Sequence, residues 1–372
     1  MMVSTHMFRF CILVILIFSM VWLGWSMVPQ HLGLLTYIDD EGVVKEVRTT
    51  ADWEKKREQI RTRMQLVMGL LPATSELGTP LVDTVSQEKR DGYTLFHIRF
   101  LAAPDEWATA FLYIPDPRER KSPLPAMLVL HGTGAPGKRL VDGESRLPNR
   151  AHARELAERG YVVIAPDYPS FGDLSDHDFL SDRYVSGTMK GIFNHMRAVD
   201  LLVGLEEVDP ERIGVIGHSL GGHNAIFVGA FDERLKVVVS SCGWTLFDYY
   251  DIGEAGTKRY GGKLGPWAQD RYMPLMRDRY GLDAARIPFD FDEAISAIAP
   301  RAFYSNAPVN DANFSVEGVR LGISRISQVY QLYDAGNNLR VNYPDAGHDF
   351  PVTVRFEAFE FIDRILHVER PL

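Results

Sequence analysis

The stretch RIGVIGHSLGGHNAIFVGA, residues 212–230, decides the fold. An apolar run typical of a buried strand ends in Gly-His-Ser-Leu-Gly-Gly, and an apolar run typical of a helix begins at once. Gly217, Ser219 and Gly221 match the pattern G-x-S-x-G, in which a serine occupies a strained turn and the glycines allow neighbouring chains to approach. The following helix directs its N-terminal N–H groups at this serine, which favours developing negative charge there. The stretch therefore predicts a reactive Ser219; the alternative is a glycine-rich turn with an inert serine.

Composition excludes several classes of protein. The 372 residues are 46% hydrophobic and 24% charged, as in ordinary globular proteins, and the length permits one large α/β domain or two smaller ones. The net charge is −9 and no basic stripe carries interleaved aromatics, which argues against a nucleic-acid partner. Clustered Cys/His spacing is missing, and no G-x-G-x-x-G turn opens the first parallel strand. We therefore expect neither a metal nor another cofactor.

The N-terminus has the pattern of a targeting segment. Residues 10–28, FCILVILIFSMVWLGWSMV, carry no charge, follow Arg9 and precede the acidic residues 39–41. The run is just long enough to span a bilayer and long for a signal peptide. We expect residues 1–28 to be an uncleaved membrane anchor, with a cleaved signal peptide and a buried core helix as alternatives. The charge bias predicts that the remainder of the chain is exported.

The rest of the chain divides into an extension and a large domain. Residues 29–80 form the extension, which includes an amphipathic helix over 51–71 that ends at Pro72. Residues 81–115 are β-rich, with alternating polarity typical of antiparallel strands. Continuous apolar strands then alternate with helices, the longest predicted helix covering residues 182–205, which predicts a mostly parallel sheet covered on both faces. We expect an α/β domain over 81–370, interrupted by a cap-like insertion at 244–290.

A serine hydroxyl needs a base to become a useful nucleophile. The chain order expected for this turn is serine, then acid, then histidine. His348 lies in YPDAGHDFP, after the last predicted strand and before the last helix. A histidine in that loop can reach back over the sheet, so we assign His348 as the base; a surface histidine is the alternative.

The acid is expected after the penultimate strand. PRAFYSNAPVNDANF places Asp311 there, where a carboxylate would hold the imidazole tautomer and stabilise the imidazolium. An aspartate in an ordinary turn is the alternative. Asp248 or Asp251, after the preceding strand, could supply the acid instead. Asp349 adjoins His348 but is predicted to cap the last helix.

An oxyanion hole needs two N–H donors. Leu220, directly after the serine, should supply one. The turn HGTG, residues 131–134, follows the first parallel strand, and Thr133 should supply the other; an ordinary βα turn is the alternative reading. Ser219 at the corner would then project its oxygen between a base and these donors.

Together these residues resemble the α/β-hydrolase superfamily, over about residues 81–370. GHSLGG, FDERLKVVVSSCG, AIAPRAFYSNAPVNDANF and YPDAGHDFP look like its dienelactone hydrolase, acetyl xylan esterase and glucuronoyl esterase branches. The resemblance implies a Ser-His-Asp hydrolase, often acting on esters of carbohydrates, with Ser219, His348 and Asp311 as the triad.

Two departures limit what the resemblance implies. Glucuronoyl esterases typically carry arginine after the nucleophile, where this chain has Leu220, and dienelactone hydrolases typically use cysteine, where it has Ser219. We therefore expect an exported serine hydrolase of carboxylic esters, with a small-molecule or carbohydrate substrate, that works through an acyl-enzyme. A serine peptidase of the prolyl-peptidase type and an inactive binding protein on the same fold are the alternatives. The aromatics of residues 244–272 could line a sugar cleft or only pack the insertion.

Overall fold

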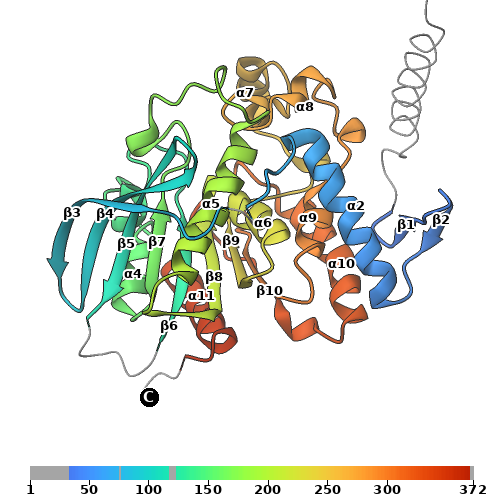
Figure 1. The fold of residues 1–372 in the computed structure, drawn as a ribbon. Coiled ribbons are helices and arrows are strands. Elements are labelled where there is room, and N and C mark those ends of the chain that lie inside the picture. Colours follow the sequence, from blue (N-terminus) through green and yellow to red (C-terminus); the bar gives the residue numbers. More distant parts are fainter. Residues whose placement is uncertain (1–32, 75–76, 117–122, 369–372) are drawn as a thin grey trace, which may run out of the picture.

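The computed structural model describes residues 33–74, 77–116 and 123–368. Its centre is a nine-stranded sheet with the strand order β11-β10-β9-β8-β6-β7-β5-β4-β3 (Figure 1). The six strands that run parallel are β6 (Leu124–Leu130), β7 (Val162–Pro166), β8 (Val208–His218), β9 (Leu235–Ser241), β10 (Ala302–Asn306) and β11 (Leu339–Asn342). The antiparallel edge is formed by β3 (Val82–Arg90), β4 (Tyr93–Ala103) and β5 (Glu106–Pro115), and β5 pairs antiparallel with β7. The mostly parallel α/β sheet predicted from the sequence is confirmed.

Helices cover the sheet on both faces, which is why its central strands are apolar throughout. Leu128 and Leu130 of β6 pack into one core cluster with α5 (Gly187–Val203) and α6 (Leu220–Phe231). Met127 and Val129 alternate with them and join a second cluster with α4 (His152–Glu158) and α11 (Val352–Ile365). Successive side chains of a strand point to opposite faces, so burial on both faces requires an unbroken apolar run. The carboxyl ends of the parallel strands lie at the same end of the sheet, and the loops described below follow them.

Two predicted helices exist but have different ends. The helix expected over 51–71 is α2 (Thr50–Met68), which starts with a capping box between Thr49 and Asp52. It ends at Gly69, whose φ of 94° leaves the helical region, and not at Pro72. The helix expected from about residue 182 begins at Gly187, because the Ser186 side chain accepts a hydrogen bond from the Met189 N–H and caps it there.

The N-terminal extension packs directly on the α/β domain. The hairpin β1 (Thr36–Ile38) and β2 (Val44–Glu46) precedes α2, and α2 lies against α9 (Phe291–Ser296), the helix that leads into β10. Glu293 of α9 is paired with Lys56 at 3.1 Å and with Arg63 at 2.5 Å, and all three side chains are buried. Burial is the main cause that lowers the pKa of Lys56 to about 8. The extension therefore contributes both cations that neutralise a buried carboxylate.

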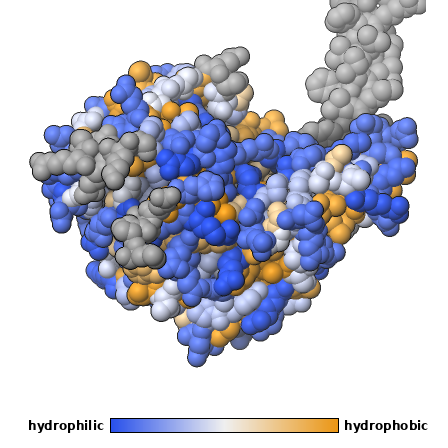
Figure 2. Space-filling model, turned by 90° about the horizontal axis from the view of Figure 1, so that it is seen from below, coloured by the Kyte–Doolittle hydropathy of each residue, from blue (hydrophilic) through white to orange (hydrophobic). Residues whose placement is uncertain are grey.

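The predicted anchor, residues 10–28, lies outside the described residues. Among the residues that are described, no helix combines the length and the apolarity needed to cross a bilayer. The end of the molecule opposite α7 and α8 is mostly hydrophilic, and its hydrophobic residues form small scattered areas (Figure 2).

The insertion predicted at 244–290 is a series of short helices over the end of the sheet where β9 ends (Figure 1). Its elements are η3 (Phe247–Tyr249), α7 (Gly253–Tyr260), η4 (Gly265–Ala268), α8 (Leu275–Asp278) and η5 (Ala284–Arg286). Trp244, Tyr250 and Trp267 are buried, so these aromatics pack the insertion, whereas Tyr249 is exposed. The remaining short elements and helices of the described residues are α3 (Arg139–Asp142), η2 (Gly172–Leu174), α10 (Val316–Leu332) and η6 (Gly336–Asn338).

Candidate active site

Ser219 lies at the corner between β8 and α6. Its backbone angles are φ 57° and ψ −118°, a conformation that non-glycine residues rarely adopt. The Ser219 N–H donates to the carbonyl of Ser241 at the end of β9, at 2.8 Å, which ties the corner to the neighbouring strand. Backbone strain of this kind persists only where the surroundings enforce it, and it is concentrated at functional sites.

The glycines around Ser219 are required by backbone contacts. A Cβ on Gly217 would lie 2.1 Å from the carbonyl oxygen of Gly221. A Cβ on Gly221 would lie 2.0 Å from the carbonyl oxygen of Leu130, in the strand that pairs with β8. Real Cβ atoms do not approach backbone so closely, and backbone at a sheet centre cannot move aside. The G-x-S-x-G pattern is thus a packing requirement at this corner.

His348 and Asp311 are in direct contact. The His348 Nδ1 lies 2.9 Å and 3.0 Å from the two carboxylate oxygens of Asp311. The Asp311 side chain is only 1% exposed, while that of His348 is 24% exposed. A carboxylate can only accept, so the Nδ1–H donates, which leaves Nε2 free to accept a proton.

The two rival acids lie elsewhere. Asp248 and Asp251 are exposed, and Asp251 pairs with Lys263 and accepts the Gly253 N–H. The structure therefore brings His348 together with Asp311 and with neither rival.

His218 connects the histidine to the serine corner. Its buried ring lies 5.0 Å from the His348 ring, measured between centroids, and it directly precedes Ser219 in the chain. Its Nδ1 contacts the Ser241 hydroxyl at 2.9 Å, and Asn306 donates to the same hydroxyl. Burial, reinforced by Arg150 and His348, holds the pKa of His218 well below its usual range. His218 is therefore a neutral ring beneath the site.

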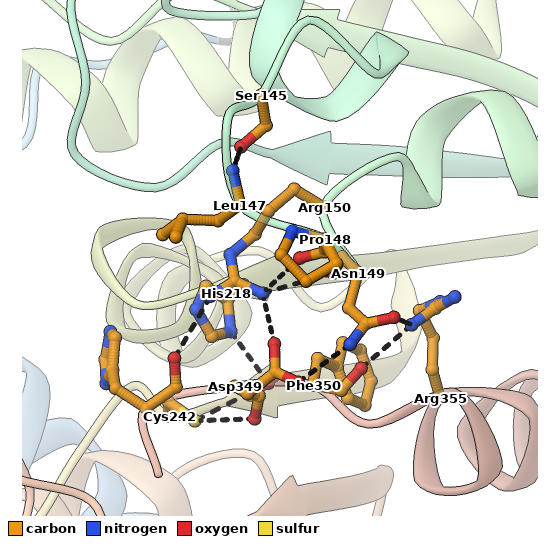
Figure 3. A network of polar contacts seen from close by, with 12 residues as sticks. Ser145, Leu147, Pro148, Asn149, Arg150, His218, Cys242, Asp349, Phe350 and Arg355 are labelled. Atoms are coloured by element: carbon orange, nitrogen blue, oxygen red, sulfur yellow. Dashed lines mark hydrogen bonds and ion pairs between the residues drawn. The ribbon is translucent and has the colours of Figure 1, made fainter.

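The loop that carries His348 is held by charged residues (Figure 3). Arg150 donates to Asp349 at 2.6 Å and to the carbonyl oxygen of His348 at 3.0 Å, and Asn149 donates to Asp349 at 2.7 Å. Burial acts to raise the pKa of Asp349, but the hydrogen bonds from Arg150 and Asn149 outweigh it and hold the pKa below its usual range. The prediction that Asp349 caps the last helix is wrong, because α11 begins at Val352 after Pro351 without a side-chain cap.

The same loop is anchored from its other side. The carbonyl oxygen of Asp349 accepts from the Asn306 amide at 2.9 Å and from the Cys242 thiol at 3.1 Å. Arg150, Asn149 and Asn306 were not singled out from the sequence, because nothing in their local pattern indicates which loop they reach. Of these three residues, Asn306 is the one with a local signal in the sequence. It is a polar residue at the carboxyl end of a buried strand, β10.

The expected oxyanion donors lie on the two segments that border Ser219. Leu220 is the first residue of α6, where helix N–H groups have no partner within the helix. The turn 131–134 runs alongside, since a Cβ on Gly132 would lie 3.7 Å from the Ser219 Cβ. Within the described part of the chain, no protein acceptor takes the Thr133 N–H. The Thr133 hydroxyl lies 3.5 Å from that of Tyr272, in the insertion.

Cys242, Asp311 and His348 place potential metal-ligand atoms within 4.8 Å of one another. Burial and the Asp311 charge raise the pKa of the Cys242 thiol well above its usual range. Metals bind the thiolate, and here the thiol is engaged as a donor to Asp349, so the group does not fit a metal site.

The sheet topology and the serine corner define a hydrolase of the α/β type. A sequence model of the Alpha/beta hydrolase family matches residues 127–360, and the chain belongs to this family. A second model, of the Abhydrolase family, matches residues 36–192. The resemblance inferred from the motifs is thereby confirmed.

Individual relatives agree with this family. The chain is 28% identical over 320 residues to "Putative hydrolase YtaP" of Bacillus subtilis (strain 168), covering 83% of this chain and 100% of that protein. It is 25% identical over 147 residues to the 4-O-methyl-glucuronoyl methylesterase of Hypocrea jecorina (strain QM6a), covering 36% of this chain and 31% of that protein. The solved structure of a glucuronoyl esterase from Solibacter usitatus shares the fold, with a TM-score of 0.68 at 20% identity over 91% of this chain and 99% of that one.

Proposed function

We propose that this protein is a serine hydrolase of carboxylic esters. Two observations carry the proposal. Ser219 occupies a strained corner, and the His348 ring, bonded through Nδ1 to Asp311, lies 5.0 Å from the ring of His218, the residue that precedes Ser219. Triads of this kind are recognised by geometry and roles.

The mechanism follows from these positions. The His348 Nε2 removes the proton from the Ser219 hydroxyl as its oxygen attacks the ester carbonyl. Asp311 keeps the Nδ1 proton in place and stabilises the imidazolium that forms. The Leu220 and Thr133 N–H groups donate hydrogen bonds to the developing oxyanion. The imidazolium then protonates the leaving alcohol, and a water activated by the same histidine releases the acid from the acyl-enzyme.

The substrate class is proposed as a carbohydrate ester, with an acetylated polysaccharide as one candidate. Support comes from the glucuronoyl methylesterase relative and from the shared fold. Leu220 at the position after the nucleophile argues against transferring the methylesterase specificity itself.

The uncharged run at 10–28 supports export, with the catalytic domain outside the cytoplasm and either anchored or released. Protease accessibility in intact cells tests the location.

The experiment is to assay the full chain with p-nitrophenyl acetate and longer-acyl esters, beside a Ser219→Ala variant. Turnover by the parent with loss of activity in the variant supports a serine esterase, and the acyl-length profile reports the size of the acyl pocket. A folded parent without turnover contradicts a general esterase and favours a specific ester, a peptide substrate or an inactive binding fold.

A further inference from the structure

A cleft of about 510 Å³ lies away from Ser219, at the β4–β5 hairpin. One wall is Trp107, which is 42% exposed at the start of β5. Lys190 and Asn194, which are four residues apart and so share one face of α5, also line the cleft. The segment 169–174 contributes Pro169 and Leu174 to the lining.

That segment separates the cleft from the oxyanion turn by a single layer of chain. Tyr168 and Phe171 form a small apolar cluster with Leu220, while Pro169 and Leu174 line the cleft. The Gly172 N–H donates to the carbonyl of Ala135, next to the turn 131–134. A polymer bound in the cleft would therefore lie one loop away from the Ser219 corner.

The charges of the cleft are mostly paired. Glu106 bonds to Arg183 at 2.5 Å and also to Lys190, and His177 contacts Asp182 at 2.8 Å. Asn194 is 1% exposed, and its Oδ1 has no hydrogen-bond partner among the described residues. A buried amide oxygen without a partner is costly, so it indicates a donor that the protein itself does not supply.

The lining excludes several kinds of ligand. Carboxylates outnumber cations, because Asp105, Glu106, Asp178 and Asp182 face only Arg183 and Lys190, which disfavours anions. Glu106 and Asp182 are paired with different side chains, and in the described residues the grouping of potential metal ligands lies instead at Cys242, Asp311 and His348. A purely apolar ligand would leave the polar groups without partners. An uncharged ligand with many hydroxyls and one apolar face fits both the polar lining and the Trp107 ring.

Trp107 is suited to stacking. The Arg99 guanidinium lies 5.1 Å from the centre of its ring and orients the indole, while much of the side chain stays accessible. The C–H face of a sugar ring packs on an aromatic surface of this kind, as its hydroxyls reach planar polar side chains alongside.

We propose that the cleft between Trp107 and Asn194 binds a neutral sugar unit, separately from the catalytic corner. Such a site would give the carbohydrate substrate of the proposed function a second point of attachment. The biological role of the site rests on that proposed function. The binding itself does not require an active triad.

The test is calorimetric titration of the full-length Ser219→Ala chain with xylohexaose, with cellohexaose and with an oligogalacturonate. We expect a neutral oligosaccharide to bind and the anionic one to bind at least tenfold more weakly. Trp107→Ala should weaken binding roughly tenfold. Phe356→Ala, which removes an equally exposed aromatic on α11, should leave the affinity unchanged.

Hydrogen–deuterium exchange keeps the test decisive if Trp107→Ala fails to fold. Protection on ligand binding should fall on residues 104–107 and 177–194, and not on the insertion. The proposal is overturned if neither neutral oligosaccharide binds at millimolar concentration, if Trp107→Ala binds as the parent does, or if protection appears only over the insertion. Hydrolysis of p-nitrophenyl acetate by the parent chain, compared with Ser219→Ala, reports the catalytic function separately from binding in the cleft.

Discussion

The serine corner and the histidine loop are held by opposite means. Ser219 is fixed by backbone packed against backbone, with glycines where no Cβ fits. His348 is fixed by side chains, through Arg150 and Asn149 on one side and Asn306 and Cys242 on the other. Close-packed backbone admits almost no substitution, whereas hydrogen-bonded side chains can be exchanged in graded steps. Substitutions at the serine corner should therefore either abolish activity or leave it unchanged, whereas substitutions in the histidine loop should lower activity in graded steps.

The largest expected effect is that of Gly221→Ala. The new Cβ would meet the Leu130 carbonyl at 2.0 Å, in the centre of the sheet. We expect the free energy of unfolding to fall by more than about 3 kcal/mol, measured by urea denaturation, with esterase activity abolished. Gly336→Ala is the matched control, because nothing would lie within 4 Å of a Cβ on Gly336. A stable, active Gly221→Ala protein would show that the corner is adaptable.

Asp311→Asn should give the next largest effect, on catalysis with little effect on stability. The amide cannot hold the His348 Nδ1–H as the carboxylate does, so kcat should fall about 10³- to 10⁴-fold. Asp251→Asn changes an exposed rival acid and should leave kcat within twofold. Loss of activity in Asp251→Asn instead of Asp311→Asn would assign the acid to the preceding strand.

Arg150→Gln tests the graded behaviour of the loop. Removing the guanidinium frees the His348 carbonyl and one Asp349 oxygen, and a small displacement of the base should lower kcat roughly 10- to 100-fold. We expect KM for p-nitrophenyl acetate to stay unchanged and Arg150→Lys to recover part of kcat. Equal losses in Arg150→Lys and Arg150→Gln would contradict a positioning role and point to a general loss of stability.

Acid should affect the two regions over different pH ranges. The pKa of His218 is lowered on folding, so below about pH 6.5 the unfolded chain binds a proton that the folded chain does not, and stability falls as the pH falls. Asp349 is also lowered, from 3.8, so its contribution is present above that value and is lost only at lower pH. His218→Gln should reduce, but not remove, the slope of the unfolding free energy with pH between pH 7 and 5, because burial also lowers the pKa of four other histidines: His131, His152, His195 and His223. Asp349→Asn should change the pH dependence only below about pH 4. An identical slope in His218→Gln and the parent would contradict the first expectation.

The contrast also explains what could be inferred from the sequence. The geometry of the serine corner depends on residues that are close in the sequence, because Gly217, Ser219 and Gly221 contact each other or the adjacent strand. A short sequence pattern therefore predicts it. The alternation of apolar strands with helices likewise predicted the mostly parallel sheet. The contacts of the histidine loop join residues between 43 and 200 positions apart, such as Arg150 and Asp349, and no local pattern records them. The prediction that Asp349 caps the last helix was wrong for this reason. The predicted end of α2 and the predicted start of α5 were also wrong, because Gly69 ends the first helix and Ser186 caps the second.

The pairing of α2 with Glu293 has a practical consequence for recombinant work on the catalytic domain. A truncation at residue 81, where the β-rich sequence begins, would remove Lys56 and Arg63 and leave the buried Glu293 carboxylate without its cations. It would also remove Arg57, which donates to the carbonyl of Ala299 just before β10, the strand that leads to Asp311. An uncompensated buried charge costs about 3–5 kcal/mol, a large share of the stability of an ordinary domain. A stable expression product should therefore keep the whole of α2, including its capping residue Thr49.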